Sequence, residues 1–210
     1  KNLGSNQSSA VTFQSDYTNP LSDTSKIELG VRSFYKEARQ ILDVANSFVN
    51  QDAYTSNQAQ TTDYLINDLV NAAYINYSNR FKSINYIAGM RFEQSYYKGD
   101  LINKNTRFSY NYPSTPDNII NALFPSVFIG KKFKNKFEWQ ANLTRKLNRP
   151  GFMQLMPFIL FSDKQNFRIG NPNLTPEFIN LSEFNFNQTY SKLNVLTSLF
   201  FRNISNPITN

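Results

Sequence analysis

The segment Ile84–Tyr96 reads INYIAGMRFEQSY and alternates between apolar and polar side chains. Its even-numbered positions are mostly apolar or aromatic, as at Tyr86 and Met90, whereas its odd-numbered positions include Asn85 and Arg91. Because successive side chains of a β-strand point to opposite faces, this alternation predicts a strand with one apolar and one polar face. The same pattern recurs in residues 27–32, 137–144 and 193–201.

Short and long polar stretches alternate between these predicted strands. Short turns are expected near residues 23, 82, 135 and 191, at intervals of about 55 residues, the size of one hairpin with its loop. Long connections are expected at 38–69, 98–124 and 148–177, and apolar spacing predicts a short helix within Glu37–Val49. Strands of about ten residues, with short turns at one end and long loops at the other, are typical of outer-membrane barrels. We therefore predict an all-β fold, an antiparallel up-and-down transmembrane β-barrel segment of about eight strands.

Three of the seven glycines, Gly30, Gly89 and Gly130, fall on the polar side of predicted strands. A glycine inside a strand weakens it unless the sheet bends or another group closely approaches the backbone. Basic residues follow two positions later, as at Arg32 and Arg91. Either the wall bends here and makes room for an inner domain, or these are ordinary tolerated glycines.

The chain of 210 residues contains neither His nor Cys. This composition excludes imidazole acid–base catalysis, thiolate nucleophiles, the common zinc sites and disulfides. The carboxylates Asp163, Glu177 and Glu183 are expected on loops, and nothing in the sequence sets the separation that a glycosidase pair requires. We expect no enzymatic activity, no cofactor and no metal.

The formal net charge is +7, and the 19 Phe and 12 Tyr suit strands with aromatic faces. The densest basic stretch, residues 131–136, has phenylalanines interleaved and belongs to no nucleic-acid-binding motif, so we interpret it as solvated turn charge and expect no nucleic-acid partner. Aromatic residues near strand ends, such as Tyr35 and Tyr96, are predicted to lie at a membrane interface.

Two short motifs flank the last long connection. The first begins with RKLNRP at 145–150 and leads to LMPF at 155–158, and the second reads GNPNLTPE at 170–177. Proline fixes φ, glycine and asparagine permit tight turns, and a terminal Glu can cap or pair, so turn chemistry explains these residue types without a ligand. Substrate capture at the cell surface is the functional alternative. The motif residues are Arg145, Arg149, Pro150, Pro157, Gly170, Asn171, Pro172, Leu174, Pro176 and Glu177.

With these motifs, the chain from about Val11 to Thr209 resembles the barrel domain of TonB-dependent receptors, and more narrowly the outer membrane β-barrel proteins common in Bacteroidetes. The resemblance implies a barrel of about 22 strands with a plugged lumen. It also implies a plug domain that carries an energy-coupling segment read by TonB. The sequence shows no plug, coupling segment or signal peptide, so we expect residues 1–210 to be a partial barrel domain, an internal or C-terminal-half fragment.

The resemblance implies the wall of a receptor that imports a glycan, a peptide or a metal chelate across a Gram-negative outer membrane. Expected partners are outer-membrane lipid, the plug domain and remaining strands, TonB acting through the plug, and a surface lipoprotein. Two alternatives stay open: a non-transporting surface barrel, acting as an adhesin or assembly scaffold, and a soluble β-sandwich that binds carbohydrate. A parent protein without a plug would contradict active transport, and a chain that stays monodisperse without detergent and binds a sugar would contradict the membrane interpretation.

Overall fold

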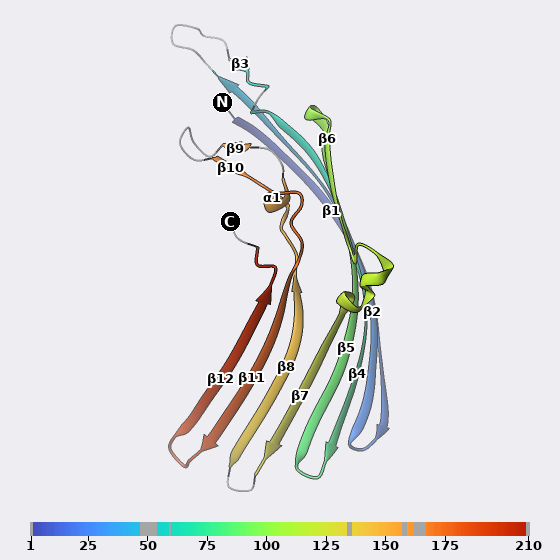
Figure 1. Ribbon diagram of the computed structural model, residues 1–210, viewed down its shortest axis with the longest axis vertical. Helices are drawn as coiled ribbons and strands as arrows, with labels where there is room; N and C mark the ends of the chain where they lie inside the picture. Colours follow the sequence, from blue (N-terminus) through green and yellow to red (C-terminus); the bar gives the residue numbers. More distant parts are fainter. Residues whose placement is uncertain are drawn as a thin grey trace.

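The computed structural model of the protein describes residues 2–46, 54–58, 60–133, 136–156, 159–161 and 167–208. Within them, a 10-stranded sheet has the main order β1-β2-β4-β5-β7-β8-β11-β12, so strands that follow one another along this path pair side by side. Figure 1 shows the sheet as one curved layer. Its main strands are β1 (Asn2–Ser22), β2 (Ser25–Asn46), β4 (Thr62–Phe81), β5 (Ile84–Leu101), β7 (Leu123–Lys132), β8 (Phe137–Asn148), β11 (Glu177–Thr189) and β12 (Asn194–Ser205). The all-β, antiparallel fold class is confirmed.

Smaller elements occupy the connections at one end of the sheet. They are β3 (Thr55–Ser56), which pairs with β2, β6 (Thr106–Tyr112), which pairs with β5, the separate hairpin β9 (Ile159–Phe161) and β10 (Phe167–Ile169), and the short helices η1 (Ile102–Lys104), η2 (Pro116–Ala122) and α1 (Phe152–Leu155). The segment with α1, β9 and β10 lies on the concave side of the sheet (Figure 1). In the part of the chain that the structure describes, no helix is long and apolar enough to cross a membrane.

Tight turns join neighbouring strands at the opposite end. Strands β1 and β2 are joined through Asp23 and Thr24, where the Ser22 hydroxyl accepts a hydrogen bond of 3.1 Å from the Ser25 backbone. Strands β4 and β5 are joined through Lys82, whose φ of 55° lies in the left-handed region that tight hairpins use. The Tyr190 backbone donates to Leu193 across the last turn. Residues 134 and 135, where the remaining turn was expected, lie outside the described residues.

Four strands of the N-terminal half are much longer than the predicted ten residues. Strands β1, β2, β4 and β5 contain 21, 22, 20 and 18 residues, so much of 38–69 and the start of 98–124 are strand rather than connection. The predicted helix within Glu37–Val49 is wrong as far as Asn46, and residues 47–49 are not described. Ile41, for example, pairs with Ser5 on one side and Asp63 on the other. Pairing on both edges overrides the weak local preference that apolar spacing suggested.

Register places the predicted apolar positions on a single face of the sheet. Ala88 lies opposite Tyr77 and Val127, and continuing the register gives one row across the sheet. This outward row contains Ile27, Tyr77, Ala88, Val127, Leu143, Ser182 and Phe201. The adjacent inward row contains Glu28, Asn76, Gly89, Ser126, Thr144, Leu181 and Arg202. We call these faces outward and inward; the inward face is the concave one that the α1 segment covers.

Apolar residues of the outward face form a belt of limited height. Along β5 the belt runs from Ile84 to Phe92, which is about 26 Å along the strand at roughly 3.3 Å per residue. At a tilt of about 40° this length spans about 20 Å of membrane, comparable with the apolar band of about 25 Å of membrane barrels. Above the belt the outward face becomes polar and charged, as at Arg39, Asp63 and Asp100. The long strands therefore continue past the belt toward the long-connection end.

Buried side chains form two clusters toward the long-connection end. One cluster contains Tyr64, Leu101 and Met156, the last of which lies just after α1. A second, around Tyr112 and Phe124, forms where η2 returns the chain from β6 to β7. The described strands form one main layer, and no second sheet of comparable size packs against it. This arrangement favours a barrel wall over a two-sheet sandwich.

Candidate functional site

A buried carboxylate organises charge on the inward face. Glu93 of β5 is only 7% exposed and accepts hydrogen bonds from two guanidinium groups, those of Arg91 and Arg149. The Arg91 contact measures 2.8 Å. Glu93 lies opposite Ala72, whose small side chain is followed across the sheet by Arg32. Ala72 therefore leaves space beside the carboxylate, with cations around it.

That space is a cavity of about 190 Å³ on the inward face. A second cavity, of about 260 Å³, lies nearer the long-connection end, and Arg149 lines both. The first is lined by Arg32, Phe34, Val70, Ala72, Arg91, Glu93 and Arg149. The second is lined by Lys36, Ala38, Ile66, Asp68, Ser95, Tyr97, Tyr110, Arg149, Pro150, Gly151 and Leu155. Because Arg149 lines both cavities, its position affects the shape of each.

Burial shifts the titration of groups around the second cavity. Burial raises the pKa of the Asp68 carboxyl, and the nearby Arg149 and Lys36 only partly oppose that rise. Burial likewise lowers the pKa of Arg149, which Asp68 opposes and Arg91 reinforces. Several buried polar atoms among the described side chains have no hydrogen-bond partner, and two of them, the Tyr97 hydroxyl and the Arg149 Nε, belong to residues that line the second cavity. Buried polar atoms of this kind ordinarily bind water or a polar ligand group.

The two predicted motifs meet and hold Arg149 in place. The Gly151 backbone donates a 2.9 Å hydrogen bond to the Gln154 side chain, and Gly170 donates one of 2.7 Å to the Met156 carbonyl. Asn171 donates to the Gln154 carbonyl at 2.7 Å. A Cβ at Gly170 would lie 2.5 Å from the Met156 nitrogen, so only glycine allows the two segments to approach this closely.

The remaining motif residues build the return of the chain into the sheet. The Asn171 side chain accepts a 3.0 Å hydrogen bond from the Asn173 backbone, which forms a turn, and Glu177 accepts one from Asn148, its neighbour in register. Arg145 lies 4.8 Å from the Phe178 ring centroid. Pro150 and Pro176 are buried, Pro172 and Leu174 are half-buried, and Pro157 lies outside the described residues. Of the motif residues, Arg149 alone brings its charge to the inward cavities.

Sequence reasoning did not single out Glu93, Asp68 or Tyr97 as site residues. Glu93 is the one carboxylate in the segment Ile84–Tyr96, and it stands at an inward, odd-numbered position. A search for acidic residues on the polar side of an alternating strand would have found it. Asp68 falls in the expected connection 38–69, and Tyr97 lies just beyond the predicted strand 84–96, so the sequence did not predict which face either side chain occupies.

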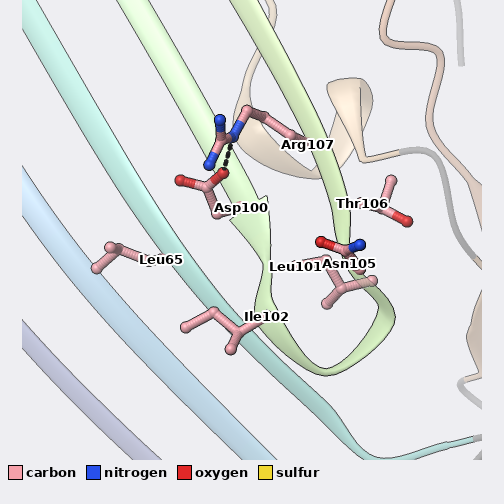
Figure 2. Close-up of a pocket in the computed structure, with 7 residues that line it drawn as sticks. All are labelled: Leu65, Asp100, Leu101, Ile102, Asn105, Thr106 and Arg107. Carbon is pink, nitrogen blue, oxygen red and sulfur yellow. Dashed lines mark hydrogen bonds and ion pairs between the residues drawn. The ribbon is translucent and has the colours of Figure 1, made fainter.

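A larger groove lies on the outward face above the apolar belt. It has a volume of about 510 Å³, and Figure 2 shows Leu65, Asp100, Ile102 and Arg107 around it. Its charges are already paired: Asp100 binds Lys98 at 2.8 Å and also Arg107. These contacts, led by Lys98, hold the pKa of Asp100 below its usual value. The unpaired buried atoms therefore make the inward cavities the stronger candidate site.

The fold has a counterpart among solved structures. The crystal structure of the ferric citrate transporter FecA in the unliganded form aligns with a TM-score of 0.67 and 15% sequence identity. The alignment covers 100% of this chain and 29% of that transporter, and at this identity it shows a shared fold. The comparison with curated proteins gave no match. A family model described as the outer membrane protein beta-barrel family matches residues 1–210. The chain thus belongs to the outer membrane protein β-barrel family and lies in the outer membrane.

Proposed function

We propose that the chain forms part of the wall of an outer-membrane receptor that imports a ligand by TonB-dependent transport, and that it catalyses no reaction. In this proposal the chain is a segment of a barrel of about 22 strands, of the type common in Bacteroidetes. The missing strands, a plug domain inside the barrel, TonB acting through the plug and a surface lipoprotein are its proposed partners.

One observation carries the proposal: buried, partnerless polar atoms line cavities on the inward face. Tyr97 and Arg149 supply these atoms, and both lie near the long-connection end, which faces the cell exterior in barrels of this kind. An adhesin or assembly scaffold would present its charges on exposed loops and needs no charged cavity inside the wall. The cavities therefore favour import over a non-transporting barrel.

The charges around the cavities favour a ligand rich in anionic or hydroxyl groups. Arg32, Arg91, Arg149 and Lys36 outnumber the carboxylates Glu93 and Asp68 there. Guanidinium groups bind carboxylates and phosphates through paired hydrogen bonds. The similar barrel named above is a ferric citrate transporter. A metal chelate with carboxylate arms, an acidic glycan and an acidic peptide all share this chemistry.

Growth of the source bacterium tests the proposal. A strain that lacks the intact protein should fail to grow when one nutrient class, an oligosaccharide, a peptide digest or a ferric chelate, is limiting. A strain that lacks TonB should show the same defect on the same nutrient. Normal growth of the first strain on all three classes would contradict import, and a defect without TonB dependence would contradict the proposed energy source.

Point variants connect the defect to the inward cavities. Arg32→Gln with Lys36→Gln should reduce uptake of the nutrient identified above, because both side chains line the cavities. The matched control is Arg107→Gln, which removes a cation from the outward groove. Equal uptake by the parent, the double variant and Arg107→Gln, at equal surface levels, would show that the inward cavities take no part in transport.

A further inference from the structure

Two lysines at the short-turn end stand over exposed aromatic rings. The Lys82 ammonium lies 5.4 Å from the Phe81 ring centroid, and the Lys131 ammonium lies 4.7 Å from that of Phe133. Phe81 is 61% exposed and Phe133 is 36% exposed. Each ring holds its cation by cation–π attraction and presents an apolar surface beside it.

Lys131 belongs to the outward face. Its register partners are Ile84 and Trp139, which stand in the last outward row before the turns. The next residue, Lys132, points to the inward face, where its register partner is Glu138. Glu138 accepts a hydrogen bond of 2.9 Å from Gln140 on that same inward face. The acidic residue of this strand pair is therefore on the other side of the sheet from Lys131.

Among the described residues, charged side chains of the outward face form ion pairs at one end of the sheet and are unpaired at the other. Above the belt, Arg39 pairs with Asp63 and Lys98 pairs with Asp100, both at 2.8 Å. At the short-turn end, no carboxylate among the described residues forms an ion pair with Lys82 or with Lys131. The outward face is thus internally neutralised at one end and carries uncompensated positive charge at the other.

Aromatic side chains extend from the lysines along the outward face. Phe133 contacts Phe137 with ring centroids 5.3 Å apart, and Phe137 stacks on Phe186 at 5.8 Å. Trp139 stacks on Phe184 at 6.0 Å. Membrane barrels carry such aromatic girdles at the level of the lipid headgroups, and their short turns face the periplasm. This end therefore meets the headgroups of the periplasmic, phospholipid leaflet.

We infer that Lys82 and Lys131 bind the phosphate of an anionic phospholipid in the periplasmic leaflet, while Phe81 and Phe133 contact its acyl chains. Lysines near a membrane surface attract anionic lipid, and here no internal carboxylate competes. The inference rests on the membrane position of the chain and does not depend on transport.

Native mass spectrometry of the intact detergent-purified protein tests the site. Phosphatidylglycerol and phosphatidylcholine are titrated separately, and only protein that shows the gel mobility of a folded barrel is used. We expect the variant Lys82→Gln/Lys131→Gln to bind phosphatidylglycerol about thirtyfold more weakly, since each lysine near anionic lipid strengthens binding about fivefold. Phosphatidylcholine binding should not change, and Lys82→Arg/Lys131→Arg should bind as the parent does.

The matched control removes the same charge at the same end from the inward face. Lys26→Gln/Lys132→Gln should change phosphatidylglycerol binding by less than about twofold, because both residues point away from lipid. An equal loss in the control would show a non-specific charge effect and overturn the site. Unchanged phosphatidylglycerol binding by Lys82→Gln/Lys131→Gln, or equal affinity of the parent for both lipids, would also overturn it.

Discussion

Tyr74 of β4 donates a 2.6 Å hydrogen bond to Asp16 of β1 across the intervening strand β2. The two residues are not neighbours in the sheet, because each pairs in register with Gly30 from opposite sides. The bond exists only because position 30 has no side chain: a Cβ there would lie 2.2 Å from the Tyr74 ring and 2.5 Å from the Asp16 carboxylate. Close approach of two side chains explains this strand glycine, which the sequence left open between a bend and mere tolerance.

Substitution of Gly30 should therefore weaken the attachment of β1. Gly30→Ala forces Tyr74 and Asp16 apart and should destabilise the protein by about 1–2 kcal/mol, the size of one hydrogen bond with some local strain. Guanidinium unfolding of the intact protein in lipid vesicles measures the loss. Gly4→Ala is the control, because no other atom lies within 4 Å of the place that its new methyl group would occupy. Equal stability of the two variants would contradict the packing described here.

Gly170 should also not tolerate a larger residue, because backbone atoms rather than side chains surround it. Gly170→Ala places a methyl group against the Met156 and Gln154 backbones, which cannot rotate away, and should destabilise the covering segment by about 1–3 kcal/mol. Limited proteolysis should then cut residues 149–177 faster. Gly151→Ala is the control, since its nearest neighbour is a side-chain atom at 3.6 Å. Unchanged cleavage in Gly170→Ala would show that the close contact between the two motifs does not hold this segment in place.

The assignment of faces predicts opposite outcomes for arginine on neighbouring rows. Met90→Arg puts a charge on the outward face within the belt and should cost about 2–4 kcal/mol in a vesicle-folding titration. Asn85→Arg, on the inward face, should cost much less. Equal costs would mean that the outward face does not contact lipid.

Glu93 and Arg149 should show strong energetic coupling. Glu93→Gln leaves Arg149 and Arg91 without their shared carboxylate, and we expect a loss of about 1–3 kcal/mol, reduced from the value for a fully buried pair because both arginines are partly exposed. Arg149→Met in the Glu93→Gln background should then cost little more. A double-mutant cycle measures the coupling, and additive effects would show that the pair contributes nothing specific.

The strands and their facing follow from local sequence. Alternation in Ile84–Tyr96 is a property of adjacent residues, so it predicts both the strand β5 and which of its side chains meet lipid, and register confirms one apolar face. The motif residue Asn171 was recognisable as a turn former for the same reason, because its side chain bonds to the backbone two residues along the chain.

Strand length and the site depended on partners distant in the chain. Residues 38–46 have an ambiguous pattern by themselves, and they became strand because β1 and β4 pair with them on both sides. Arg149 and Glu93 are 56 residues apart. Their contact arises only when the segment that begins at Arg149 and contains α1 folds back onto the inward face. Local sequence determined which way the side chains of the clearly alternating strands point. Closure of the long loops decided which side chains meet, since such contacts depend on the positions of all intervening strands.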